Sequence, residues 1–132
     1  MRKPKHRVTL DYANAVIELV ADGPVDANEL TQVFSEMREA AYKLRGRAIK
    51  CFIDLRLATI SSPEMAQKIK EHQQAMAKLG MHRVAEVVTS SLLALQMNRV
   101  AREAGVHERV QRFSDADAAR RWLLSGKQPD DR

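Results

Sequence analysis

The residues best suited to binding chemistry lie where an apolar run meets a charged loop. The run ends at Asp54, which is followed by Leu55 and Arg56, and Ser61 and Ser62 come shortly before a proline. Carboxylate and guanidinium groups hold partners by charge and hydrogen bonds. A serine at a helix N-terminus can also carry phosphate, because the backbone N–H groups and the helix dipole favour negative charge there. This segment is therefore the first candidate site, although we favour a plain N-cap as the role of the serines.

Other reactive side chains lack the neighbours that catalysis requires. His72 falls at the apolar spacing of its helix, so we expect a packed, hydrogen-bonded histidine rather than a general base. Cys51 lies inside a predicted buried strand, where cysteines are usually inert. The remaining histidines, His6, His82 and His107, have no partners at metal-ligand spacing. We predict no enzyme activity, no metal site and no cofactor.

Glu86 is the most unusual charged residue, because it interrupts the apolar run from Val84 to Val88. An unpaired charge is costly inside a protein. We favour a salt bridge with a neighbouring arginine or lysine over a role in a pocket, and the second interpretation stays open.

Composition limits the class of protein. The 132 residues fit one domain, and 45% hydrophobic with 30% charged residues is ordinary globular usage. No apolar run approaches the roughly 20 residues that span a bilayer, and no apolar stretch follows the basic residues 2–7, so we expect no secretory signal. One cysteine agrees with a reducing, cytoplasmic compartment. The net charge is +5, but aromatic residues do not alternate with the basic tracts, which makes nucleic-acid binding unlikely.

Apolar periodicity alternates between strands and helices along the chain. We predict strands at Val8–Tyr12, Ala15–Ala21, Ala48–Leu55, Arg83–Val88 and Arg109–Phe113. Four helices should follow, and their predicted N-caps are Asp26, Ser62, either Ser90 or Ser91, and Ser114. Ser114 and Asp117 should form a capping box. The helices should end near Gly46, Gly80, Gly105 and Gly126. This order predicts a single-domain α/β fold: a mixed, mostly parallel sheet with an antiparallel edge strand and four covering helices. The domain should span residues 7–126, between a basic tail, 1–6, and a flexible tail, 127–132.

Three segments together resemble a known family. Cys51-Phe52-Ile53-Asp54, the strand Arg83–Val88 and the ending Phe113–Leu123 are similar to the bacterial SpoIIAA-like proteins of the STAS superfamily. The resemblance implies the fold of anti-sigma-factor antagonists, which is distantly similar to that of lipid-binding Sec14 domains. Phosphorylated antagonists place a serine directly after the strand-end aspartate, whereas this chain has Leu55 there. The nearest hydroxyls are those of Thr59, Ser61 and Ser62, so Ser61 and Ser62 are the candidate phosphorylation sites.

These observations predict a non-catalytic protein-interaction or regulatory module, with a protein partner and a homodimer as a further candidate. The binding loop would comprise Asp54, Leu55, Arg56, Ser61 and Ser62, joined by Thr89 and Ser90 from the next strand end, because ligands and partners gather at the carboxyl ends of parallel strands. The alternative is a domain that binds a small apolar or acidic, lipid-like ligand. Such a domain should contain a closed apolar pocket of several hundred Å³. An interaction module should instead have a filled core and a surface groove.

Overall fold

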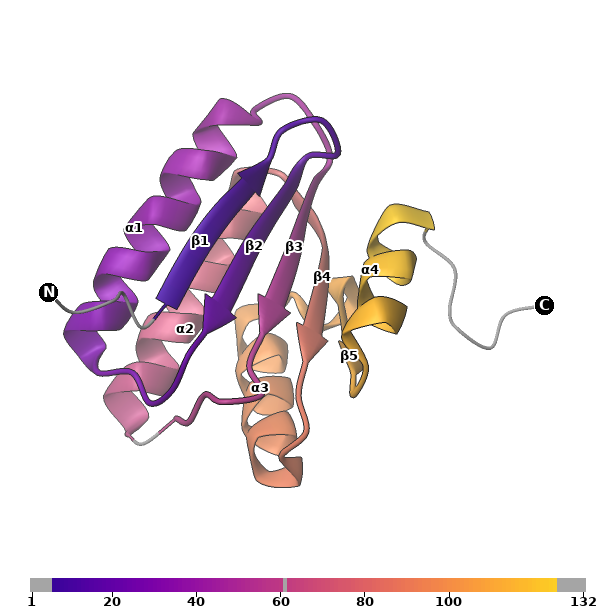
Figure 1. Ribbon diagram of the computed structural model, residues 1–132. Coiled ribbons are helices and arrows are strands. Elements are labelled where there is room, and N and C mark those ends of the chain that lie inside the picture. Colours follow the sequence, from indigo (N-terminus) through magenta and orange to yellow (C-terminus); the bar gives the residue numbers. More distant parts are fainter. Residues whose placement is uncertain (1–5, 61, 126–132) are drawn as a thin grey trace, which may run out of the picture.

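The computed structural model describes residues 6–60 and 62–125. Its order of strands and helices is the predicted one, with one short 3-10 turn, η1, added before the last strand (Figure 1). The strands are β1 (His6–Asp11), β2 (Val16–Ala21), β3 (Ile49–Asp54), β4 (Met81–Val87) and β5 (Val110–Phe113), and η1 spans His107–Arg109. The helices are α1 (Ala27–Lys43), α2 (Pro63–Lys78), α3 (Ser91–Ala104) and α4 (Ala116–Ser125).

The five strands form one sheet in the order β1-β2-β3-β4-β5. β1 pairs antiparallel with β2, and every other pair is parallel, so the predicted mixed sheet with an antiparallel edge strand is confirmed. β3 is the central strand, which agrees with the buried strand predicted from its apolar run. Asp54 is in register with Val20 on one side and with Val87 on the other, which aligns the carboxyl ends of three strands.

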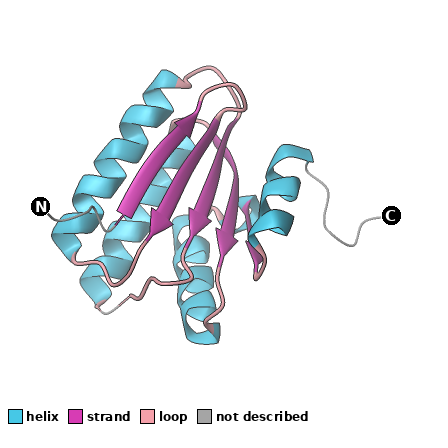
Figure 2. Ribbon diagram, in the orientation of Figure 1, coloured by secondary structure: helices cyan, strands magenta, loops and turns pink. Residues whose placement is uncertain are grey.

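Helices cover both faces of the sheet (Figure 2). One face packs against α1, α2 and α3 and forms the larger core, which includes Ile49 and Cys51. α4 covers the other face, where Phe52 belongs to a smaller cluster with Trp122. The alternation along β3 follows from the two-residue period of a strand. No described helix is long and apolar enough to cross a membrane.

Capping side chains begin the helices. Asp26 and Glu29 form a complete capping box at α1, and Ser62 and Ser90 cap α2 and α3. The predicted cap of α4 at Ser114 is wrong. The helix begins at Ala116, so Asp115 occupies the cap position, and its carboxylate accepts a hydrogen bond from the N–H of Ala118 at 3.1 Å.

The predicted domain boundaries need one adjustment. β1 begins at His6, which the sequence analysis assigned to the basic tail, because this residue pairs with Ala21 of β2. The other residues of that tail, the second predicted tail at 127–132, and Gly126 all lie outside the described residues.

Candidate functional site

A tight turn at the end of β3 holds Asp54 and Arg56 together. One carboxylate oxygen, Oδ1, accepts hydrogen bonds from the Arg56 backbone N–H at 3.1 Å and from its Nε at 3.0 Å, and Oδ2 accepts from a terminal guanidinium nitrogen at 2.7 Å. These bonds and the adjacent positive charge hold the pKa of Asp54 below its usual range. Asp54 is buried and Arg56 is exposed, so the turn presents a fixed guanidinium at the surface.

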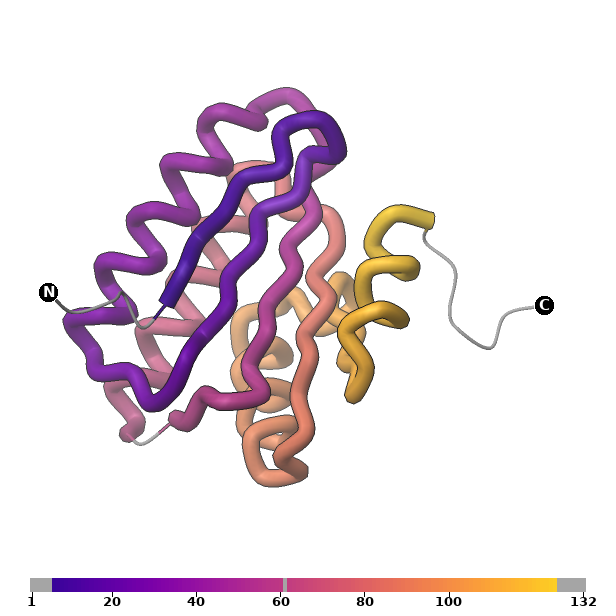
Figure 3. The backbone as a smooth tube through the Cα atoms, in the orientation of Figure 1, coloured from indigo at the N-terminus to yellow at the C-terminus, as the bar shows by residue number. Residues whose placement is uncertain are grey.

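The loop that follows is attached to the sheet and to the core. The Leu55 N–H donates to the carbonyl of Val87 at 2.9 Å, which joins the loop to the end of β4. Leu55, Ala58 and Ile60 pack against the larger core. Leu57 points away from it and is 60% exposed. The chain leaves β3 and β4 at the same end of the sheet, so this loop and the start of α3 are neighbours there (Figure 3).

The predicted hydroxyl residues fall at the same end but serve the helices. Ser62 Oγ accepts from the Met65 N–H at 3.2 Å, and Ser90 Oγ accepts from the Leu93 N–H at 3.2 Å. Thr89 is exposed on the connection from β4 to α3. Ser61 lies outside the described residues. The structure thus places the predicted residues other than Ser61 at one end of the sheet, and the backbone hydrogen bond of Leu55 links the two strand ends.

The sequence analysis missed two leucines at this end. Leu92 and Leu95 on the first turns of α3 are 67% and 69% exposed. Their signal is present in the sequence, because they fall off the helix face that buries Leu93 and Met97. We call the exposed set the carboxyl-end surface: Arg56, Leu57, Thr89, Ser90, Leu92 and Leu95.

A groove runs between α2 and α3, beside the end of the loop 55–60. Its volume is about 480 Å³. Ile60 and Ser62 lie at one side of it, and the ion pair between Arg99 and Glu103 lies at the other, with 3.1 Å between Nε and Oε2. A surface groove of this kind is what the sequence analysis expected of an interaction module.

A second charged cluster lies on the opposite face, under α4. The guanidinium of Arg120 donates two hydrogen bonds to the Glu18 carboxylate on β2, at 2.6 and 3.2 Å, and lies over the Phe52 ring with 4.0 Å to its centroid. The Glu18 contact, and beyond it the charges of Asp117 and Asp54, raise the pKa of Arg120. The sequence analysis gave no role to Glu18, because its partner is far away in sequence.

The remaining titratable groups are buried on the α1 to α3 side. His72 stacks on Phe34 instead of forming the predicted hydrogen bond, and burial, with a smaller effect of Arg38, lowers its pKa to about 3. Burial raises the pKa of Cys51 to about 12, which agrees with an unreactive thiol. Glu86 has the predicted salt bridge, with 2.9 Å between its Oε1 and Arg112 Nε. Burial raises the pKa of Glu86, and Arg112 opposes the shift.

Comparisons with known proteins identify the family of this chain. The SpoIIAA-like family model matches residues 16–124, which include the strand ends, α3 and α4. The chain belongs to the SpoIIAA-like family. No curated protein matches its sequence. Among solved structures, the anti-sigma factor antagonist SpoIIAA in its unphosphorylated form is similar, with a TM-score of 0.58 and 9% sequence identity over 88% of this chain and 94% of that chain. At this identity the likeness shows the fold alone.

The described residues of this SpoIIAA-like fold keep their candidate reactive groups, Cys51 and His72, in the interior. They contain no group of three His, Cys, Asp or Glu side chains that could hold a metal ion. Cys51 is buried, and His72, which is neutral at neutral pH, is stacked on Phe34 inside the core. The groups that reach the surface are a fixed guanidinium, hydroxyls and leucines. Such groups can bind a partner by charge, hydrogen bonds and apolar contact.

Proposed function

We propose that this SpoIIAA-like protein is a non-catalytic regulatory module of the bacterial cytoplasm that binds a protein partner through its carboxyl-end surface. The observation that carries the proposal is the exposure of Leu57, Leu92 and Leu95. They are half of the six strongly exposed large apolar side chains in the described part of the chain, and all three lie at one end of the sheet. Exposed apolar side chains gathered in this way are typical of interaction sites.

Charge at the same surface supports a protein partner. The side chain of Arg56 is 46% exposed, and its bidentate pairing with Asp54 fixes its direction. A fixed rim charge beside an apolar centre gives an interface its orientation and its specificity. We expect the partner to present a carboxylate opposite Arg56 and apolar side chains opposite the leucines.

The family membership supports a regulatory role. The solved relative is described as an anti-sigma factor antagonist, which is a regulatory protein. We extend that class of role to this chain and leave its specific partner to experiment. A second copy of this chain is one candidate partner, because a C2 dimer joins the same surface of two subunits.

Phosphorylation is the regulatory step that we attach to this surface. The solved relative is described in an unphosphorylated form. In this chain Ser62 caps α2, so a phosphate on Ser61 or Ser62 would lie near a helix N-terminus, where negative charge is stabilised. Mass spectrometry of the protein purified from its native host tests this step, and a fully unmodified peptide under all growth conditions would contradict it.

A pull-down from the native host tests the surface itself. The bait is the full chain, and the variant combines Leu57→Ser, Leu92→Ser and Leu95→Ser. A matched control combines Tyr42→Ser and Leu124→Ser, which alter exposed apolar side chains elsewhere on the molecule. We expect the triple variant to lose the captured partner while keeping its unfolding midpoint, and the control to retain both.

Light scattering distinguishes a second copy from a different protein. A homodimer through this surface would become a monomer in the triple variant and stay a dimer in the control. Retention of every captured protein and of the native oligomeric state by the triple variant would refute the proposed surface.

A further inference from the structure

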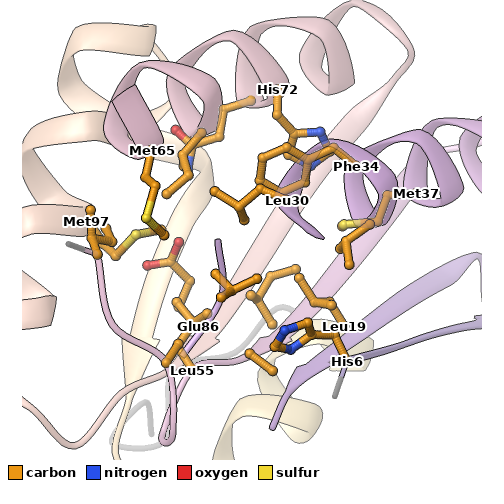
Figure 4. Close-up of a pocket in the computed structure, with 18 of the residues that line it drawn as sticks. His6, Leu19, Leu30, Phe34, Met37, Leu55, Met65, His72, Glu86 and Met97 are labelled. Carbon is orange, nitrogen blue, oxygen red and sulfur yellow. The ribbon is translucent and has the colours of Figure 1, made fainter. Parts of the chain in front are cut away.

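A cavity lies between the sheet and the helices α1 to α3, beneath the loop 55–60. Its volume is about 90 Å³, and aliphatic and methionine side chains form most of its lining (Figure 4). An engineered apolar cavity of roughly 150 Å³ holds a benzene molecule, so this space suits roughly four or five non-hydrogen atoms. It is smaller than the several hundred Å³ expected of a lipid-binding pocket, but large for a close-packed core.

Three polar residues that line this cavity are more than nine-tenths buried as whole residues. They are His72, Gln73 and Glu86. Among the described residues, His72 Nδ1 and Gln73 Oε1 have no hydrogen-bond partner. Polar atoms left in this state are costly, and those of native proteins usually have a function. Of the other two polar residues of the lining, Thr59 is exposed, and His6 is half-buried, with its Nε2 3.4 Å from Glu29 Oε2 but not hydrogen-bonded to it.

Glu86 gives the cavity its chemical character. Its carboxylate points into the space that Met65 and Met97 also line (Figure 4). The Arg112 guanidinium is close enough for an ion pair, yet the contact lacks hydrogen-bond geometry, and Arg112 also donates to Asn98 Oδ1 at 3.4 Å. Arg112 therefore faces the carboxylate as an ion pair, while Glu86 Oε1 has no hydrogen-bond partner among the described residues. An ionised carboxylate accepts hydrogen bonds and cannot donate them.

We propose that this cavity binds a small uncharged molecule with an apolar body and one hydroxyl or N–H donor. The apolar lining accommodates the body, and the Glu86 carboxylate accepts the hydrogen bond, with Gln73 Oε1 as a second acceptor. An anionic ligand is repelled by the negative charge of Glu86, and a cationic ligand loses its hydration close to the positive charge of Arg112. Both therefore bind more weakly than an uncharged ligand. This inference is independent of the carboxyl-end surface.

Three probes of similar size separate these cases. The alcohol n-butanol has a donor, its isomer diethyl ether has none, and butyrate is an anion. Isotope-labelled methionine methyl groups report binding by NMR, because Met37, Met65, Met81 and Met97 line the cavity, while the equally buried Met76 does not and serves as the internal control. So small a ligand should bind with millimolar affinity.

The expected result is saturable shifts of the four cavity methionines with n-butanol and an unmoved Met76 signal. Diethyl ether should bind about fivefold more weakly, which is the effect of one net hydrogen bond, and butyrate should not bind. Equal affinity for n-butanol and diethyl ether would overturn the proposal. So would shifts that move Met76 equally or never saturate.

Substitutions at Glu86 and Gln73 test whether these residues determine which ligands the cavity binds. Glu86→Gln keeps the shape of the side chain and removes its negative charge, so butyrate should bind to this variant. If the folded variant still failed to bind butyrate, the proposed role of Glu86 would be contradicted. If the variant fails to fold, Gln73→Leu replaces it, with the exposed neighbour Gln74→Leu as the control. Gln73→Leu should weaken n-butanol binding severalfold and leave diethyl ether binding as it is in the native protein. An n-butanol affinity equal to that of the native protein would count against the proposal.

Discussion

Phe34 and His72 stack face to face between α1 and α2, with ring centroids 3.8 Å apart and ring planes 5° from parallel (Figure 4). The stack replaces water around the imidazole with an aromatic face, and Arg38 adds a positive charge nearby. Both effects disfavour the protonated ring and lower its pKa to about 3. His72 is therefore a neutral part of the core at neutral pH.

Acid should destabilise the fold through His72. The unfolded imidazole has a pKa of 6.5, so between that pH and about 3 only the unfolded state takes up the proton. Stability from the neutral ring is present above pH 6.5, and the free energy of unfolding should fall by roughly 1.4 kcal/mol per pH unit below it.

Urea denaturation at pH 7 and pH 5 tests this linkage. The variant His72→Phe, which preserves a stack, should lose roughly 2 kcal/mol of the pH dependence over that interval. The control His82→Gln removes an exposed histidine of β4 and should keep it. An unchanged pH dependence in His72→Phe would show that other groups govern acid stability.

Trp122 should anchor α4 to the sheet. It is buried with Leu123, its ring centroid lies 5.7 Å from that of Phe113, and the Arg83 guanidinium lies 5.8 Å from its centroid. Truncating so large a buried ring removes apolar contact and leaves a cavity, so Trp122→Ala should lower the free energy of unfolding by about 3 to 5 kcal/mol. Chemical denaturation measures the loss, with the exposed Leu124→Ala on the same helix as the control. A nearly native midpoint for Trp122→Ala would mean that α4 is peripheral.

Local sequence signals were sufficient for the strands and helices and for the central position of β3. Apolar periodicity and capping residues act over a few positions, so Asp26 and Ser62 could be assigned without tertiary structure, and the cap of α3 could be narrowed to Ser90 or Ser91. Asp115 could not be separated from Ser114, because both are good caps one residue apart. The alignment of Asp54 with Val87 followed from the general rule for parallel strands.

Long-range contacts limited the prediction of the site. The partner of Glu18 is Arg120, 102 positions later, and no local pattern encodes that pairing. The stack of His72 on Phe34 depends on how two helices pack, so the sequence indicated a buried histidine without its partner. Leu92 and Leu95 lie off the buried face of α3. The apolar spacing that predicts that face does not indicate what the exposed leucines do.

The contact between Glu18 and Arg120 should stabilise the docking of α4 modestly. The arginine pairs with the carboxylate on β2 and covers the Phe52 ring, but its side chain is 46% exposed and partly screened by water. A double-mutant cycle with Glu18→Gln and Arg120→Gln should give a coupling free energy of roughly 0.5 to 1 kcal/mol. The exposed neighbour Arg121→Gln should show no coupling to Glu18→Gln. A coupling of zero for the first pair would mean that apolar packing alone holds the helix.

The turn formed by Asp54 and Arg56 should matter more for partner binding than for folding. Replacing both residues, as Asp54→Asn with Arg56→Gln, leaves no buried charge without its partner, and the asparagine oxygen can still accept the backbone N–H at position 56. The unfolding midpoint should therefore stay near native, while the loss of the fixed guanidinium should abolish the association detected in the pull-down. Charge reversal at Arg120 and Arg121 on α4 is the control, and it should keep the partner. If the turn variant kept every partner while the α4 variant lost them, the binding surface would be the last helix and not the carboxyl-end surface.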